Sequence, residues 1–159
     1  MRCALSAVRF GICFYAQRTA HGAWRNEMKL RIIAVGKIKS RSIQNLVDEY
    51  LSRLVHYLPT EIVVVKDDAR ALSKLEPTDH LIVLDERGQQ RSSVELSELL
   101  SDHQGRGTKT IVLFIGGEDG VGSEVKARAN MLLGLSKMTF PHELVQAMLL
   151  EQLYQHVLF

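Results

Sequence analysis

The chain has 159 residues, 46% of them apolar, which is enough for one domain with a buried core. Ordinary charged and aromatic fractions exclude a disordered chain, and no apolar run approaches the ~20 residues of a membrane-spanning helix. The formal charge is +2, but residues 1–27 hold four arginines and one acid, whereas the rest holds 16 basic and 17 acidic residues and shows no overall bias towards nucleic acid.

Residues 1–27 show neither helical periodicity nor strand alternation, and we exclude them from the fold. Met28 opens a clear strand pattern, which favours a start codon assigned too far upstream; an organelle-targeting peptide is the alternative. Both cysteines, Cys3 and Cys13, lie in this leader, so the rest of the chain has no disulfide framework or cysteine zinc site. A reducing, cytoplasmic location is expected.

Residues 28–159 are expected to form a single α/β domain, because strand-like runs alternate with helical patterns. The predicted strands are residues 30–35, 61–66, 80–84, 110–115 and 135–140. The predicted helices are residues 43–57, 69–75, 94–103, 123–133 and 141 to the chain end. Ser92 and Glu95 form a capping-box pattern, and Ser123 is expected to cap the fourth helix. The alternation predicts a mainly parallel sheet with helices on both faces.

Ligands of such sheets bind beyond the carboxyl ends of the strands, where three loops carry suggestive residues. The loops are residues 85–88, 116–122 and 137–142. The second is rich in glycine, which lets backbone amides approach a ligand. It is neither a phosphate loop, since Ser123 stands where lysine is required, nor a dinucleotide motif, since Val125 replaces the third glycine. A plain strand-to-helix turn is the alternative.

The segment 135–142 runs from an apolar stretch into Pro141, which suits the first turn of a helix. Such a segment offers carbonyls and amides to an adenine edge and an apolar wall to its face. An ordinary junction with a surface histidine is the alternative. The final helix is apolar on more than one side, which predicts a homodimer, with a central helix in a monomer as the alternative.

Basic residues cluster in two loops that follow predicted strands: Lys37, Lys39 and Arg41, and then Arg87 and Arg91. If they meet near the glycine-rich loop, they are expected to contact phosphates; solvated loops are the alternative. The histidines at positions 56, 80 and 103 are scattered without metal-ligand spacing, so they are given no role and no metal is expected.

Four motifs occur in order at residues 81–88, 113–120, 135–142 and 150–154. Together they resemble the ribosomal RNA large subunit methyltransferase H family, minimal members of the SPOUT methyltransferases. The resemblance implies an α/β fold with a C-terminal trefoil knot, a homodimer, and S-adenosyl-L-methionine as methyl donor. It also implies methylation of N3 of a pseudouridine in large-subunit (23S-type) ribosomal RNA. The cofactor-binding residues that it implies are Leu84, Gly116, Ser136, Lys137, Met138, Thr139, Phe140 and Pro141.

His142 is the histidine nearest to this expected site and is our candidate for assisting removal of the base proton. Two departures from the family pattern stand out. The tail that follows the Leu-Tyr motif in the family is expected to be lacking, and Gln146 and Gln155 stand where the family has arginine. The alternatives are therefore a non-catalytic RNA- or ribosome-binding relative and an unrelated nucleotide-binding domain.

Overall fold

The computed structural model describes residues 28–158, so the predicted leader with its two cysteines lies outside the described residues. Five parallel strands form one sheet in the order β2-β1-β4-β3-β5. The strands are β1 (Lys29–Val35), β2 (Thr60–Val65), β3 (His80–Gln90), β4 (Thr110–Ile115) and β5 (Met131–Gly134). The helices are α2 (Arg41–Leu54), α3 (Asp68–Leu72), α4 (Ser93–Gly105), α5 (Ser123–Arg128) and α6 (His142–Leu158).

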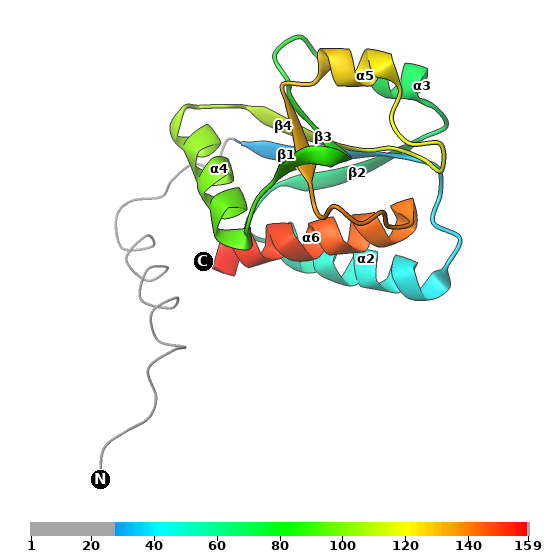
Figure 1. The fold of residues 1–159 in the computed structure, drawn as a ribbon. Coiled ribbons are helices and arrows are strands. Elements are labelled where there is room, and N and C mark those ends of the chain that lie inside the picture. The colour runs from blue at the N-terminus through cyan, green and yellow to red at the C-terminus, as the bar shows by residue number, and fades with distance from the viewer. Residues whose placement is uncertain (1–27, 159) are drawn as a thin grey trace.

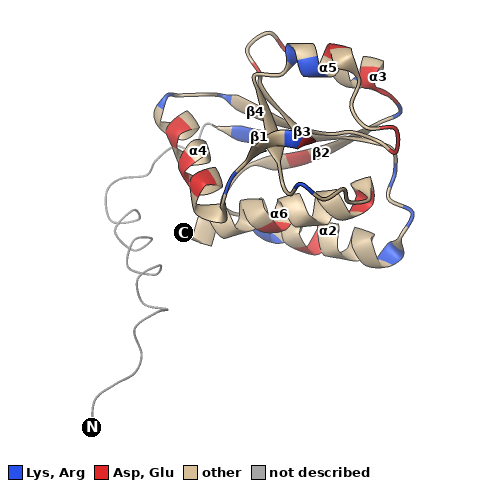
Figure 2. Cartoon of the chain, viewed as in Figure 1, with Lys and Arg blue, Asp and Glu red and all other residues tan. Residues whose placement is uncertain are grey.

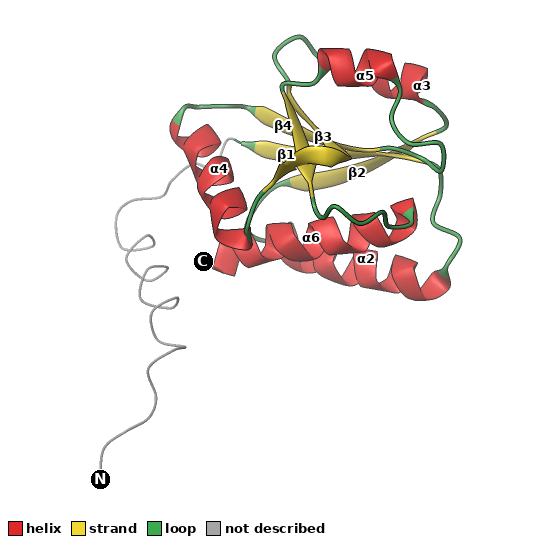
Figure 3. Ribbon diagram, viewed as in Figure 1, coloured by secondary structure: helices red, strands yellow, loops and turns green. Residues whose placement is uncertain are grey.

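Helices cover both faces of the sheet (Figure 1). The helices α2 and α6 lie side by side on one face with α4 packed against α6, and α3 and α5 lie on the other. Two apolar clusters fill the two layers, and the central strand β4 is buried throughout residues Ile111 to Ile115. Strands buried on both faces have apolar residues at every position, as this one does. The predicted α/β class and parallel sheet are confirmed (Figure 3).

The start of α4 follows the predicted capping box. The Ser92 hydroxyl accepts a hydrogen bond from the amide of Glu95 at 3.2 Å, and the Glu95 carboxylate accepts one from the amide of Ser92 at 2.7 Å. This reciprocal pair satisfies two amides that a helix start otherwise leaves unpaired.

The prediction was wrong for the chain between β4 and α6. The helix ends at Arg128 rather than at residue 133, Gly122 rather than Ser123 is its N-cap, and the last strand is Met131–Gly134 rather than residues 135–140. Asn130 explains the early end: its amide donates to the carbonyl of Leu81 and its side chain accepts from the amide of Leu81, each at 2.8 Å. These bonds dock the next residues beside β3, a tertiary choice that a short apolar run does not reveal.

The strand β3 continues beyond its predicted end at residue 84, because it pairs with β5 twice. Leu84 and Gln89 are both in register with Leu133, so residues 85–88 bulge out of the ladder. Gly88 permits the return, since a Cβ there would lie 2.6 Å from the carbonyl carbon of Leu133. A bulge of this kind redirects side chains, here towards the carboxyl edge of the sheet.

None of the helices within residues 28–158 combines the length and the apolarity that crossing a bilayer requires.

Candidate functional site

A cavity of about 420 Å³ lies at the carboxyl ends of β3, β4 and β5. Its walls are the β3 bulge, the glycine-rich loop after β4, and the loop between β5 and α6. Strands that are consecutive in the sheet but distant in the sequence thus bring together the three loops that were expected to form the site. Parallel strands place their carboxyl ends at one edge, which is why such loops can meet.

Most of the residues that the family resemblance implied lie on this cavity. Six of the eight line it: Leu84, Gly116, Ser136, Met138, Thr139 and Phe140. Lys137 and Pro141 belong to the same loop but do not line the cavity, whereas His142 does. Their placement is established by the fold; their role in cofactor binding stays a prediction.

The glycine-rich loop turns too tightly for side chains at its start. A Cβ on Gly116 would lie 2.6 Å from the carbonyl oxygen of Gly120 and 2.7 Å from a methyl of Val121. The turn closes through the amide of Gly120, which donates to the carbonyl of Gly117 at 3.1 Å, and Gly120 has a φ of 81°. The backbone of this loop therefore forms part of the cavity wall directly.

An ion pair that sequence reasoning missed stands beside this wall. The Asp85 carboxylate, in the β3 bulge, lies 2.6 Å from the Lys126 ammonium on α5 and accepts the amide of Arg87 at 2.9 Å. The Lys126 hydrogen bond, and then that of the Arg87 amide, hold the pKa of Asp85 below its usual value. Asp85 is therefore a fixed negative charge rather than a proton acceptor. A carboxylate directly after a buried strand was the only signal in the sequence.

The loop from β5 to α6 lines the cavity with the apolar residues Leu135, Met138 and Phe140 and with the hydroxyl residues Ser136 and Thr139. The Ser136 hydroxyl accepts the amide of Met138 at 3.0 Å, which bends the loop locally. The Met138 side chain is 71% exposed although it is apolar. Apolar side chains next to hydroxyl groups suit a planar heterocycle with polar edges.

The first turn of α6 holds the connection between β1 and α2 in place. The Glu143 carboxylate accepts the amide of Ser40 at 3.1 Å. The amide of Lys39 and then that of Ser40 lower the pKa of Glu143, so this carboxylate keeps its charge. Gly36 has a φ of 87°, and a Cβ there would lie 3.5 Å from Nε2 of His142. The connection between β1 and α2 therefore lies against the first turn of α6, beside His142.

The basic residues of the two loops meet only in part. Lys39 Nζ lies 3.5 Å from the Glu118 carboxylate of the glycine-rich loop, and Arg87 lines the cavity. Arg91 lines a different groove, between α2, α4 and α6. The expectation that Arg91 joins the others is wrong, because the β3 ladder resumes after the bulge and carries it towards α4.

Among the histidines of residues 28–158, only His142 lines the cavity. His80 begins β3, and its ring lies 4.1 Å from that of His103 near the end of α4. Burial lowers the pKa of both rings. In the part of the chain that the structure describes, no group of three metal-binding side chains is placed to hold an ion.

Comparison with known proteins gives a consistent result. A family model described as a predicted SPOUT methyltransferase matches residues 28–158. Relatives with the name "Ribosomal RNA large subunit methyltransferase H" include one from Trichlorobacter lovleyi, 42% identical over 141 residues that span 80% of this chain and 92% of the relative. Another, from Koribacter versatilis, is 41% identical over an alignment of 133 residues, with 80% of this chain and 90% of the relative covered.

Solved structures share the fold at low sequence identity. A methylase family protein from Neisseria gonorrhoeae is 14% identical, with a TM-score of 0.55 over 84% of this chain and 85% of that one. One from Haemophilus influenzae is 12% identical, with a TM-score of 0.52 over 82% of this chain and 65% of that one.

Proposed function

The chain belongs to the SPOUT methyltransferase family and, within it, to the ribosomal RNA large subunit methyltransferase H proteins, and on this premise we propose that it methylates large-subunit ribosomal RNA with S-adenosyl-L-methionine as donor. The finer proposal is N3 of a pseudouridine as the target atom. The observation that carries the proposal is the single cavity formed by the three loops at the carboxyl edge. The C-terminal knot stays a prediction. Ribosomal RNA as substrate makes the cytoplasm the fitting location.

The residues present fit this donor. The cavity volume of about 420 Å³ lies within the range of small-molecule sites, ~300–1,000 Å³. The loop from β5 to α6 offers amides, carbonyls and an apolar wall, which suit adenine. Glu118 and Asp119 line the cavity as well, and their charge favours a cationic sulfonium over a polyphosphate.

When bound, the donor supplies an electrophilic methyl group on sulfur. The protein then has to align the acceptor nitrogen, exclude water and accept the proton that this nitrogen loses. We assign the proton-accepting role to His142, because it lines the cavity, begins α6 and lies next to Gly36. Asp85 forms an ion pair with Lys126 and holds the β3 bulge in position instead.

The first experiment measures donor binding by calorimetry and transfer of a labelled methyl group to large ribosomal subunits that lack the modification. We expect micromolar binding at one site per chain and transfer to one uridine-type base. Donor binding without transfer, or no donor binding by the folded chain, would favour the non-catalytic RNA-binding alternative and overturn the enzyme proposal.

The His142 assignment is tested with His142→Ala, and His56→Ala is the control because His56 is exposed beyond α2. We expect His142→Ala to lower kcat by about 10²-fold or more, as loss of a general base does, with the donor Kd unchanged. Near-normal turnover of this variant would remove His142 from the mechanism.

We also propose that the chain forms a homodimer through the groove between α2, α4 and α6. The groove has a volume of about 520 Å³ and is lined by Leu46, Tyr50, Leu144 and Met148, among others. Leu46 is 43% exposed on a groove whose lining is mainly apolar, and such grooves are typical of protein–protein contacts. A second copy of α6 is the occupant we infer, because that helix adds the apolar Leu144, Ala147 and Met148 to the groove besides the side that it buries in the core.

The molar mass in solution tests the dimer. We expect light scattering to give twice the chain mass for the unchanged protein and the chain mass for Met148→Asp. Val64→Asp is the control, because Val64 is an exposed apolar residue on β2, outside the groove. A monomeric unchanged protein, or a dimer that survives Met148→Asp, would contradict this interface.

A further inference from the structure

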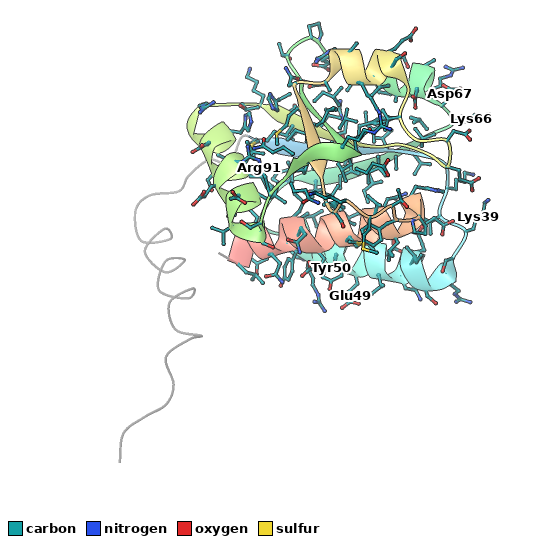
Figure 4. The ribbon with its side chains drawn as sticks, in the orientation of Figure 1. Lys39, Glu49, Tyr50, Lys66, Asp67 and Arg91 are labelled. Atoms are coloured by element: carbon teal, nitrogen blue, oxygen red, sulfur yellow. The ribbon has the colours of Figure 1, made fainter. Side chains whose placement is uncertain are left out.

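The connection between β1 and α2, residues 36–40, and the first residue of α2 together carry three basic side chains near the cavity. Lys37, Lys39 and Arg41 are all exposed, and they follow the strand next to β4 in the sheet. Figure 2 shows basic residues on this connection next to the acidic turn of the glycine-rich loop. Figure 4 shows Lys39 at the same end of the molecule as Lys66, which follows β2. Basic residues thus extend along the carboxyl edge away from the cavity.

This connection is held in place by the fold. Its far end is tied by the Glu143 carboxylate, which accepts the amide of Ser40 at 3.1 Å, and its near end begins at Gly36 against His142. Ser40 then caps α2. Because His142 and Glu143 both belong to the first turn of α6, the backbone of this connection has a defined position relative to the cavity, which His142 lines. Less backbone entropy is lost when such a loop binds a partner.

The charges on this connection are available for an anionic partner. Within residues 28–158, no carboxylate lies within ion-pairing distance of Lys37 or Arg41. Lys39 contacts Glu118 at 3.5 Å, but the two side chains are 80% and 71% exposed. Exposed pairs of this kind contribute about 0–1 kcal/mol, so Lys39 can exchange Glu118 for a phosphate at small cost.

The acidic residues nearby are mostly engaged elsewhere. Asp67 caps α3 by accepting the amide of Arg70, and Asp68 accepts the amide of Gly122 at 2.6 Å. Glu143 binds the two amides described above. Glu118 and Asp119 remain exposed, and both line the cavity. The cavity wall formed by the glycine-rich loop is therefore acidic, and the flank on the β1 side is basic. This division suits a cationic cofactor inside and a phosphate backbone outside.

We propose that three basic residues form an arm that binds the phosphate backbone of the RNA strand next to the target base. The arm consists of Lys37, Lys39 and Arg41. The proposal rests on the function proposed above and adds the surface that receives the RNA. The arm contributes affinity and placement rather than sequence recognition, since phosphate contacts carry no base information. It is also compatible with the near-neutral net charge of residues 28–159, because only three neighbouring basic side chains contact the phosphates.

The test compares two triple alanine variants with equal loss of charge. One replaces Lys37, Lys39 and Arg41, and the control replaces Lys74, Lys109 and Arg106, which are exposed and precede β3 and β4 at the opposite edge. The binding of a fluorescent single-stranded uridine oligonucleotide and of transcribed large-subunit ribosomal RNA is measured from low to physiological salt. For each, the slope of log Kd against log salt is determined, together with the donor Kd.

We expect the arm variant to bind both RNAs more weakly and to lose roughly 2 units of slope, at about 0.7 per phosphate contact on a single strand. The donor Kd and the control variant should match the unchanged protein. Equal slopes for the arm and control variants, or no RNA binding by the unchanged protein, overturn the arm. If the unchanged protein binds donor and transfers the methyl group while the slopes are equal, only this inference fails and the proposed function stands.

Discussion

The closest backbone approach in the cavity wall makes Gly116 the most informative position to change. In Gly116→Ala, the new methyl would lie 2.6 Å from the carbonyl oxygen and 2.9 Å from the carbonyl carbon of Gly120. Both are backbone atoms of the same tight turn, so neither can rotate away as a flexible side chain would. The turn that lines the cavity has to move, although the backbone conformation of residue 116 itself suits alanine.

Forcing an extra methyl into a packed site costs about 1–3 kcal/mol. If the turn moves outward to relieve the contact, this free energy is lost from donor binding. The donor Kd then rises ~5- to 150-fold, since each 1.4 kcal/mol changes it tenfold. If the turn stays, the cost appears in the free energy of unfolding instead. Calorimetry with S-adenosyl-L-methionine and urea denaturation of the same preparation measure the two contributions.

Gly105→Ala is the matched control, because a Cβ at Gly105 meets no atom within 4 Å and the residue ends α4 far from the cavity. Alanine is favoured over glycine in a helix by ~1 kcal/mol, so this variant should be as stable as the unchanged protein or more so, with the same donor Kd. A Gly116→Ala protein with unchanged donor affinity and unchanged stability would refute the claim that this turn is both tight and part of the donor site.

Three further predictions concern stability and its pH dependence. Lys126→Met leaves the nearly buried Asp85 carboxylate without its ammonium partner and should lower the free energy of unfolding by about 1–3 kcal/mol. Adding Asp85→Asn should recover part of this loss. If the double variant recovers none of it, the ion pair is not the cause. Burial lowers the pKa of His80 and His103 below 6.5, so at a falling pH the unfolded chain binds protons before the folded chain does. Stability should therefore fall as the pH drops below about 6.5. A urea midpoint that does not change between pH 7 and 5 would contradict this. Ser92→Ala removes one half of the capping box and should cost about 1 kcal/mol by urea denaturation, whereas a loss below a few tenths would mean that solvent replaces the cap.

Local chemistry along the chain determined which segments could be strands or helices and where their ends would interact with a ligand. The apolar run of β4 needed burial on both faces, and Ser92 with Glu95 marked the start of α4. Gly116 and the glycines that follow it predicted a turn whose backbone approaches a ligand directly. These features depend on residues close in sequence, and for that reason the pattern of residues was sufficient to predict them.

Only the tertiary structure decided which distant residues meet. Whether Met131–Gly134 would continue a helix or form a strand depended on hydrogen bonds between Asn130 and Leu81, 49 residues apart. The pairing of Asp85 with Lys126 depended on the β3 bulge, which in turn exists because β5 pairs with β3 on both sides of it. Contacts of this kind are set by how strands are ordered in the sheet, and strand order is a property of the whole packed chain rather than of any segment.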